Sequence, residues 1–204
     1  MTQSLDDLEK YFYKDDNLLT IIKAGVLHAQ FETIHPFLDG NGRTGRMLIT
    51  FFLWHEHFLE NPVLFLSSYF KNHQETYYEK LTKYHSGNIA TWIDFFLDGV
   101  IEIANEAIMT VDKITKLRER DMMKMQSLGK RAAKSATLVM PKLYAQPIVN
   151  VPVVQKWTGF SRPGAQEVIK RFIEMKILSP KNIDVTYGQS YIYQEYLNIF
   201  NAQH

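Results

Sequence analysis

The sequence predicts a mainly helical protein with three segments: a helical bundle over residues 1–125, a basic linker over 126–134, and a small winged helix-turn-helix domain with a β-hairpin over 135–204. In the first segment, apolar residues recur at helical intervals and no run alternates with period two. In the last, two short helical segments joined by a glycine turn precede a hairpin pattern. The charge divides as well, because residues 1–112 carry 8 basic against 16 acidic residues, and residues 113–134 carry 8 against 2. This asymmetry indicates a domain boundary.

The composition indicates a soluble globular chain. With 204 residues, of which 46% are hydrophobic, the chain can form a sizeable core. The lack of cysteine excludes disulfide frameworks, thiolate zinc sites and thiol nucleophiles, and it fits a reducing compartment. No apolar stretch approaches the ~20 residues that a membrane span needs, and no basic N-terminal head precedes an apolar run. We therefore expect a cytoplasmic protein without a membrane partner.

Five helices are expected in the first segment. Ser4 is expected to cap the first, and Pro36 to end the second, because proline disfavours helical φ/ψ at the residue before it. Ser86, Gly87 and Asn88 separate the fourth helix from the fifth. The predicted ranges are Ser4–Tyr13, Asn17–Ile34, Met47–Phe58, Tyr69–His85 and Ile89–Arg120.

The last segment has the pattern of a helix-turn-helix followed by a wing. Pro147 ends a first helix, Gly159 supplies the turn, and Ser161 is expected to cap the helix after it. The basic stretch Lys113–Lys134 is either the end of the last bundle helix or a linker. The predicted elements of the domain are helices at Ala136–Ala145, Val151–Trp157 and Arg162–Lys176, and a hairpin within Leu178–Tyr193.

The role of this small domain stays open at the level of sequence. Arg162, Gln166, Lys170 and Arg171 are polar positions of its second helix, the element that enters the DNA major groove in helix-turn-helix proteins. DNA binding is therefore one interpretation. The other is a structural domain or one that mediates homodimerisation.

Residues 35–46 are the densest polar stretch of the chain, with a histidine, a carboxylate, an asparagine, two arginines and three glycines. A buried helix is expected to follow this stretch, and helix N-termini bind anions. Glycines that adopt φ > 0 let consecutive N–H groups point into one concavity, which suits phosphate. We therefore expect Gly40, Gly42 and Gly45 to form a phosphate-binding loop.

The glycine spacing also fits two other phosphate motifs, and both are rejected. Residues 40–45 satisfy G-x-G-x-x-G, but a dinucleotide site requires a preceding strand within a βαβ unit. The same residues have the spacing of a P-loop, but Arg46 and Met47 stand where Lys and Ser or Thr are needed.

Charged residues around the glycines predict a nucleotide site. Arg43 and Arg46 are three apart at the start of a helix, so both can hold phosphate oxygens. Their charge opposes the helix dipole, and a bound anion would resolve this conflict. We expect Asp39 to bind Mg²⁺ together with phosphates, and His35 to act as a general base for a hydroxyl.

This stretch resembles the signature of a known family. Residues 35–46 match, at every defined position, the H-x-F-x-[D/E]-G-N-G-R-x-x-R motif of Fic-domain proteins. Leu27–Ile34 and Tyr77–Leu81 also resemble the family, and the resemblance covers residues 1–120. It implies a Fic-type helical bundle and a protein adenylyltransferase. Such an enzyme transfers AMP from ATP to a Ser, Thr or Tyr hydroxyl of a target protein, and pyrophosphate leaves.

The resemblance implies a role for each residue of the motif. His35 would take the hydroxyl proton, Asp39 would hold Mg²⁺ between the α- and β-phosphates, and Phe37 would point into the core and fix the loop. Tyr77 and Tyr78 would line the base side of the nucleotide, with simple core packing as the alternative. The implied phosphate-binding residues are Gly40, Asn41 and Gly42 at the α-phosphate, Arg43 at the β-phosphate, Arg46 at the γ-phosphate, and Thr44 and Gly45 within the same loop.

Two departures from the family pattern leave the activity open. Relatives of this type usually carry in front a hairpin flap that aligns the target, and often an inhibitory helix with the pattern [S/T]-x-x-x-E-[G/N]. Here Met1 leads into a helix that resembles the one after the flap, so both features are expected to be missing. Thr115–Glu119 resembles the inhibitory pattern, but Arg120 follows it. The alternative to an enzyme is a catalytically silent regulatory or DNA-binding protein.

Overall fold

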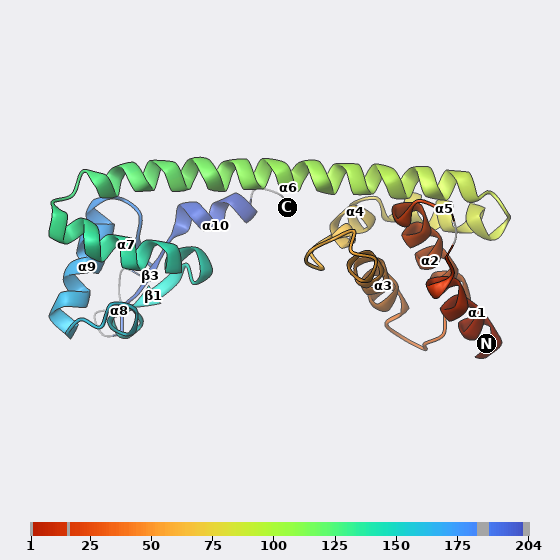
Figure 1. Cartoon of the computed structure of the whole chain (residues 1–204), viewed down its shortest axis with the longest axis horizontal. Helices are drawn as coiled ribbons and strands as arrows, with labels where there is room; N and C mark the ends of the chain where they lie inside the picture. Colours follow the sequence, from red (N-terminus) through yellow and green to blue (C-terminus); the bar gives the residue numbers. More distant parts are fainter. Residues whose placement is uncertain (1, 16, 183–187, 202–204) are drawn as a thin grey trace. The chain divides into compact units, whose positions relative to one another are not determined.

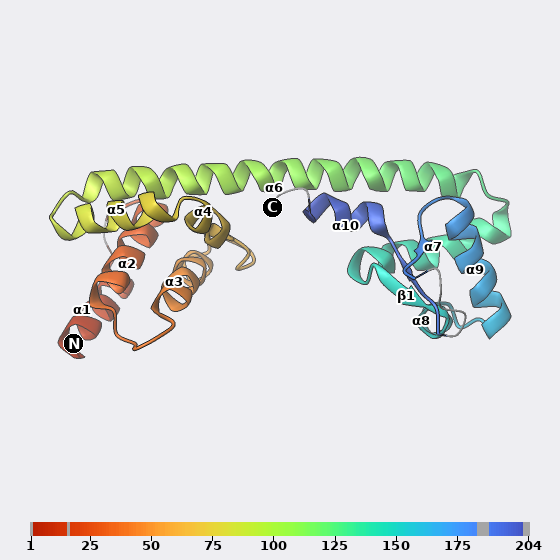
Figure 2. The ribbon, with the colours of Figure 1, turned by 180° about the vertical axis from the view of Figure 1, so that it is seen from behind.

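The computed structural model describes residues 2–15, 17–182 and 188–201, and the chain divides into two compact units, Met1–Ala107 and Ile108–His204. Figures 1 and 2 show the elements of each unit from opposite sides. Helices dominate both units, and the strands of the described residues form one small sheet in unit 2. The predicted mainly helical fold with a small β-hairpin is therefore confirmed. Within the described part of the chain, no helix is long and apolar enough to cross a membrane.

Unit 1 consists of five helices and the first part of a sixth, which continues into unit 2. Pro36 ends the second helix as predicted, but the next helix begins at Asn41 rather than Met47. Ser4 lies inside the first helix and does not cap it. The predicted helix Tyr69–His85 is two helices, because His73 leaves the helical conformation with φ −115° and ψ 37°. The bounds are α1 (Thr2–Tyr13), α2 (Thr20–Ile34), α3 (Asn41–His55), α4 (Leu66–Asn72), α5 (Gln74–His85) and α6 (Ile89–Gln126).

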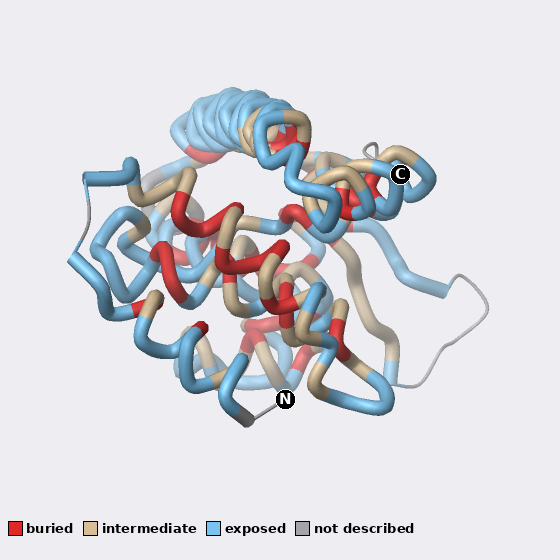
Figure 3. Tube along the Cα trace, turned by 90° about the vertical axis from the view of Figure 1, so that its right-hand side faces the viewer, coloured by how far each residue is buried: buried red, intermediate tan, exposed pale blue. Residues whose placement is uncertain are grey.

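The core of unit 1 is aromatic and centres on Trp92, which is fully buried. Its Nε1 donates a hydrogen bond to the Gly25 carbonyl oxygen at 2.8 Å. The His28 ring stacks against both Phe70 and Trp92, whose ring centroids lie 5.6 and 5.7 Å from its own. Figure 3 shows the buried stretches on helix turns that other elements surround, whereas outer turns and loops are exposed. These contacts anchor α2, whose C-terminus leads into the polar stretch.

Unit 2 contains the second part of α6, four further helices and a three-stranded antiparallel sheet of order β1-β3-β2. The β2–β3 pair confirms the predicted hairpin, in which Ser179 lies opposite Ile192. Residues 183–187 of the hairpin lie outside the described residues. Neither β1 nor α10 was predicted. The bounds are α7 (Lys130–Ala145), β1 (Ile148–Asn150), α8 (Val151–Thr158), α9 (Arg162–Glu174), β2 (Ser179–Pro180), β3 (Ser190–Ile192) and α10 (Gln194–Asn201).

The basic stretch Lys113–Lys134 is mostly helical. It includes the last part of α6, and α7 already begins at Lys130, so only a short turn separates the two helices. The helical phase simply continues through the charged residues, because lysine, arginine and methionine are all good helix formers.

Helices α8 and α9 form the predicted pair around a glycine turn. Asn150 caps α8 by accepting a hydrogen bond from the Val153 N–H at 3.1 Å, and Gly159 ends it with φ 72°. Ser161 precedes α9 as predicted, but its side chain makes no capping hydrogen bond.

Two of the four polar side chains singled out on α9 are paired along their own helix. Lys170 lies 3.9 Å from Glu174, and Arg171 lies 3.2 Å from Glu167. DNA contact, dimerisation and the winged-helix assignment itself stay predictions.

A polar network joins α6 to α10, and to Tyr193 between β3 and α10, within unit 2. Asp121 is fully buried, and its carboxylate accepts a hydrogen bond from the Tyr193 hydroxyl. Arg120 donates to Glu195 Oε2 at 2.7 Å and to Asp121 Oδ1 at 3.2 Å. The network therefore holds the C-terminal helix of the unit onto α6.

Candidate nucleotide-binding site

The polar stretch forms the turn between α2 and α3. At the end of α2, His35 adopts the left-handed conformation with φ 47° and ψ 58°, and its N–H donates to the Phe31 carbonyl oxygen at 3.0 Å. A non-glycine residue at positive φ is uncommon, and such strain clusters at functional sites. Pro36 then prevents the helix from continuing. The exposed His35 side chain therefore stands at the point where the chain leaves α2.

Only one of the three glycines has the predicted backbone conformation. Gly40 has φ 88° and precedes α3, and its carbonyl oxygen accepts a hydrogen bond from the Thr44 N–H at 3.0 Å and from Thr44 Oγ1 at 3.1 Å. Gly42 and Gly45 lie in the first turns of α3, so the prediction of a left-handed glycine nest is wrong for them. The unpaired N–H groups of this region are those of the first helical turn.

Asn41 fixes the loop from inside. It is buried, its Oδ1 accepts the Phe37 N–H at 2.9 Å, and its Nδ2 donates to the Phe37 carbonyl oxygen at 2.5 Å. Contact of Asn41 with a phosphate stays a prediction, since both polar ends of its side chain hold the loop. The Phe37 ring is half exposed, with its centroid 6.2 Å from that of Phe31, so its predicted place in the core is wrong. The two hydrogen bonds between Asn41 and the Phe37 backbone, rather than burial of the Phe37 ring, therefore order the loop.

The two arginines project from the first two turns of α3. Arg43 lies 3.4 Å from Asp39, whose Oδ1 also accepts the Gly40 N–H at 2.7 Å. Both Arg43 and Asp39 are exposed. Arg46 has no ion pair among the residues that the structure describes. One arginine thus has a carboxylate partner in the loop, and the other has none within contact distance.

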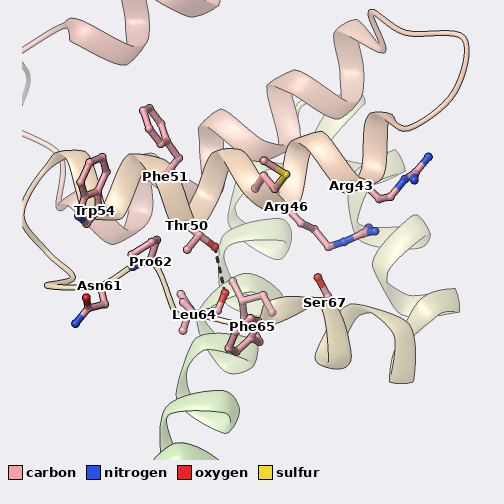
Figure 4. Close-up of a pocket in the computed structure, with 12 residues that line it drawn as sticks. Arg43, Arg46, Thr50, Phe51, Trp54, Asn61, Pro62, Leu64, Phe65 and Ser67 are labelled. Atoms are coloured by element: carbon pink, nitrogen blue, oxygen red, sulfur yellow. Dashed lines mark hydrogen bonds between the residues drawn. The ribbon is translucent and has the colours of Figure 1, made fainter. Parts of the chain in front are cut away.

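A pocket of about 860 Å³ lies beside α3, and both arginines line it. Figure 4 shows them at one end, with the larger apolar side chains farther along the helix. Thr50 Oγ1 donates to the Leu64 carbonyl oxygen at 3.1 Å, which ties the segment before α4 to α3. The other lining residues are mostly apolar: Met47, Phe51, Trp54, Pro62, Phe65 and Leu66. The pocket therefore combines a cationic end with an apolar wall, which suits a phosphate attached to an apolar or aromatic group.

The sequence interpretation missed this apolar wall. Met47, Phe51 and Trp54 recur at helical spacing on a side of α3 other than that of the buried Ile49 and Phe52. The apolar residues on two sides of this helix were the feature of the sequence that could have predicted the wall.

The tyrosines expected on the base side do not line the pocket. Tyr77 is buried in the core, where its hydroxyl lies 3.0 Å from His28 Nε2 and its ring contacts Phe70 and Trp92. Tyr78 is exposed. For Tyr77, core packing is what the structure shows, and a nucleotide contact by either residue stays a prediction.

The N-terminal region of the chain is similar in sequence to known proteins. Residues 1–53 match the model of the Fic/DOC family. The chain is 35% identical over 75 residues to Protein adenylyltransferase Fic of Aedes aegypti and to that of Culex quinquefasciatus. It is also 35% identical over 77 residues to a probable protein adenylyltransferase of Aquifex aeolicus. Residues 1–53 of this chain therefore have the sequence pattern of the Fic/DOC family.

The extent of these matches is limited. Each alignment covers 37% of this chain, and it covers 14% of each mosquito protein and 22% of the Aquifex protein. A crystal structure of a Fic family protein from Desulfovibrio desulfuricans G20 aligns with 94% of this chain and 54% of that one, with a TM-score of 0.52 and 20% identity. This likeness concerns the fold.

Beneath the loop between α2 and α3 lies a group of titratable side chains. Burial lowers the pKa of His28 to about 4, so its imidazole is neutral at pH 7. Burial and the nearby Glu32 raise the pKa of Tyr77, so its hydroxyl keeps its proton. Burial also raises the pKa of Glu32, while His35 and Arg46 oppose that rise. Glu32 was not predicted as a site residue, although it lies three positions before His35.

The loop between α2 and α3 offers one carboxylate, that of Asp39, for a metal ion. No group of three or more possible metal ligands occurs among the described residues. A lone exposed carboxylate such as Asp39 fits Mg²⁺ when phosphates and water supply the remaining ligands, as is usual for this ion.

Proposed function

We propose that this chain is a protein adenylyltransferase, which transfers AMP from ATP to a Ser, Thr or Tyr hydroxyl of a target protein. The observation that carries the proposal is the arrangement of residues 35–46. A strained, exposed His35 ends α2, and Arg43 and Arg46 project from the first turns of α3 into one pocket. A base and a phosphate-binding helix end therefore stand at the two ends of one short loop.

The N-terminus of α3 supplies the phosphate site. Its first N–H groups have no helical partner, and its dipole favours a negative ligand. Arg43 and Arg46 each oppose that dipole by ~0.3–1 kcal/mol when no anion is present. We assign the α-phosphate to the backbone of Gly40, Asn41 and Gly42, the β-phosphate to Arg43 and the γ-phosphate to Arg46. The open space beside Arg46 leaves room for the nucleotide.

The reaction needs one proton acceptor. The hydroxyl oxygen of the target attacks the α-phosphorus, and His35 takes the hydroxyl proton. The bond from the α-phosphorus to the oxygen that bridges to the β-phosphate breaks, and pyrophosphate leaves. General base catalysis of this kind contributes roughly 10² to 10⁴ in rate. His35 is accessible for this step because it is exposed.

Asp39 is the residue that would hold Mg²⁺. When bound, the ion would neutralise charge on the α- and β-phosphates. Asp39 pairs with Arg43 in the structure. When a nucleotide binds, Asp39 would contact the ion and Arg43 would contact a phosphate instead.

The test is transfer of AMP in a cell lysate. The chain is incubated with ATP, Mg²⁺ and lysate proteins, and mass spectrometry then searches for AMP on protein hydroxyls. We expect modified Ser, Thr or Tyr with the wild-type chain and none with His35→Ala. His85→Ala, which alters an exposed histidine on α5, is the matched control and should keep full activity. Equal labelling by the wild type and His35→Ala would overturn the proposal, and parallel reactions with GTP and CTP identify the donor.

A further inference from the structure

Helix α6 is one continuous helix of 38 residues (Figure 1), and one of its sides points away from the core of each unit. Trp92 is buried in the core of unit 1, and Leu117 is buried in the core of unit 2. Ile101 lies nine residues after Trp92, and Ile108 lies nine residues before Leu117, which is about two and a half helical turns in each case. Both isoleucines therefore lie on the side of α6 opposite the buried residues, where they are 59% and 67% exposed.

Exposed residues on this side of α6, most of them apolar, recur with the spacing of a coiled coil. The intervals alternate between three and four residues from position 101 to position 122, as do positions a and d of about three heptads. Single exposed apolar residues are common on protein surfaces, whereas a continuous row indicates an interaction site. Arg118 takes one position of the repeat. The other positions, all exposed, form what we call the α6 seam: Ile101, Ala104, Ile108, Val111, Thr115 and Met122.

The charges along α6 change sign at the middle of the seam. Residues 89–112 contain five acidic residues and no basic residue, whereas residues 113–126 contain five basic and two acidic residues. If two such helices lay parallel, like charges would lie side by side. If they lay antiparallel, the acidic half of each helix would lie along the basic half of the other, and opposite charges attract. The charge pattern therefore suits a second copy of the same helix in the antiparallel orientation.

We propose that the α6 seam is the interface of a homodimer in which the α6 helices of two copies pack antiparallel. Two identical helices in this orientation are related by a two-fold axis, so the same surface serves both copies. The pairing accounts for two features of α6 together. It removes the exposed apolar side chains from water, and it places the two oppositely charged halves side by side.

One register gives apolar contacts in every central layer of the pair. In an antiparallel pair, each a position faces a d position of the other helix. When Ile108 faces the partner's Ala104, Ile101 faces the partner's Val111. The same register brings the exposed Asp94 opposite the partner's Arg118, at each end of the apolar layers. Arg118 lies over the Tyr144 ring, 5.4 Å from its centroid, and has no carboxylate within ion-pair distance in the described part of its own chain.

The first test is the mass of the full chain in solution, measured by sedimentation equilibrium. We expect about 48 kDa, twice the chain mass of 23.9 kDa. Ile108→Glu should raise the dissociation constant of the dimer ~10-fold or more, because it places a charge at the centre of the interface. Met109→Glu is the matched control. Its side chain is also exposed but points about 100° away from Ile108, so the dimer should persist. Circular dichroism checks that both variants keep their helices.

Three results of this test would overturn the proposal. One is a chain that stays monomeric up to ~0.1 mM, which sets a lower limit on any dissociation constant. Another is an equal loss of the dimer in the two variants. The third is a monomer that binds phosphatidylcholine vesicles through Ile108, which would assign the seam to lipid.

The second test measures the orientation, and it is simple because the chain contains no cysteine. Ala104→Cys and Ile108→Cys are prepared as separate chains, which are then mixed and oxidised. We expect a disulfide-linked dimer from the mixture that contains one chain of each kind, since these two positions face each other. Each variant alone should give far less linked dimer. Efficient linking of Ile108→Cys alone, or no linking in the mixture, would overturn the antiparallel pairing.

Discussion

Each unit buries a tyrosine beside a carboxylate, and the two pairs differ in how the carboxylate is compensated. In unit 2, Asp121 receives a hydrogen bond from Tyr193 and lies 3.2 Å from Arg120 and 3.6 Å from Lys124. In unit 1, Glu32 raises the pKa of the nearby Tyr77, but one buried oxygen of Glu32 has no hydrogen-bond partner in the described structure. The first carboxylate is satisfied by its own unit, and the second is not.

The difference separates a carboxylate with several partners from one that keeps an unpaired oxygen. A buried charge with several partners joins elements, as Asp121 joins α6 to the residue between β3 and α10. A carboxylate left partly unpaired beside a polar loop retains charge that acts on the residues of that loop. Stability should therefore depend strongly on Asp121 and only weakly on Glu32.

The largest effect is expected from Asp121→Asn. The substitution removes the negative charge that balances Arg120 and Lys124 and weakens the bond to Tyr193, so the free energy of unfolding should fall by ~3 kcal/mol. Hydrogen exchange with mass spectrometry on peptides of unit 2, together with urea unfolding, measures this loss.

Two variants make that prediction specific. Glu32→Gln should change the unfolding free energy by less than ~1 kcal/mol, since Oε1 forms no hydrogen bond to lose. Glu119→Gln, an exposed neighbour on α6, should change it by ~0.5 kcal/mol or less. Equal losses for Asp121→Asn and Glu32→Gln would abolish the contrast between the two pairs.

The next largest difference between the units is expected in how their stability responds to acid, because unit 1 contains the buried His28. In the folded chain its pKa is lowered from 6.5 to about 4. Between these two pH values the histidine is protonated in the unfolded chain but neutral in the folded chain. Stability is therefore full above pH 6.5 and is lost as the pH falls toward 4, by roughly 3 kcal/mol in total. Unit 2 has no histidine among its described residues, so peptides of unit 1 should lose protection from hydrogen exchange first.

A variant without the titrating ring tests the cause of that acid response. His28→Gln should flatten the dependence of unit 1 stability on pH between 7 and 4, whatever its stability at pH 7. His85→Gln, which changes an exposed histidine, should keep the wild-type slope. An unaltered slope in His28→Gln would assign the acid response to other groups.

The sequence predicted the outline of unit 1, and it gathers the candidate site residues in one stretch, because both depend on local patterns. Pro36 ended α2 where expected, and residues 35–46 held the chemistry in one continuous stretch. The predicted start of α3 at Met47 was wrong. Asn41 and Gly42 are poor helix formers, but the helix nevertheless begins directly after the left-handed Gly40.

Longer-range features could not be read from the sequence. Tyr77 is an ordinary polar aromatic in its own segment, and only the fold places it against His28 in the core. β1 comprises only Ile148–Asn150, and its pairing with β3 brings together segments far apart in sequence. The closeness of Glu32 to Gly45 likewise depends on the approach of α3 to α2, which a periodic pattern does not encode.

The smallest and most local test of the comparison is Gly45→Ala. The new Cβ would meet Glu32 Oε1 at 2.6 Å and His28 Nδ1 at 3.0 Å, and the buried His28 cannot move aside. The unfolding free energy should fall by ~1–3 kcal/mol, as is usual for overpacking. Gly42→Ala is the matched control on the same helix. Its Cβ would meet only the end of the flexible Arg46 side chain at 3.0 Å, so the gain in helix propensity of up to ~1 kcal/mol should appear. Urea unfolding of both variants decides the matter. If Gly45→Ala is as stable as Gly42→Ala, α3 does not depend on close contact with α2, and the carboxylate of Glu32 is not held against the loop.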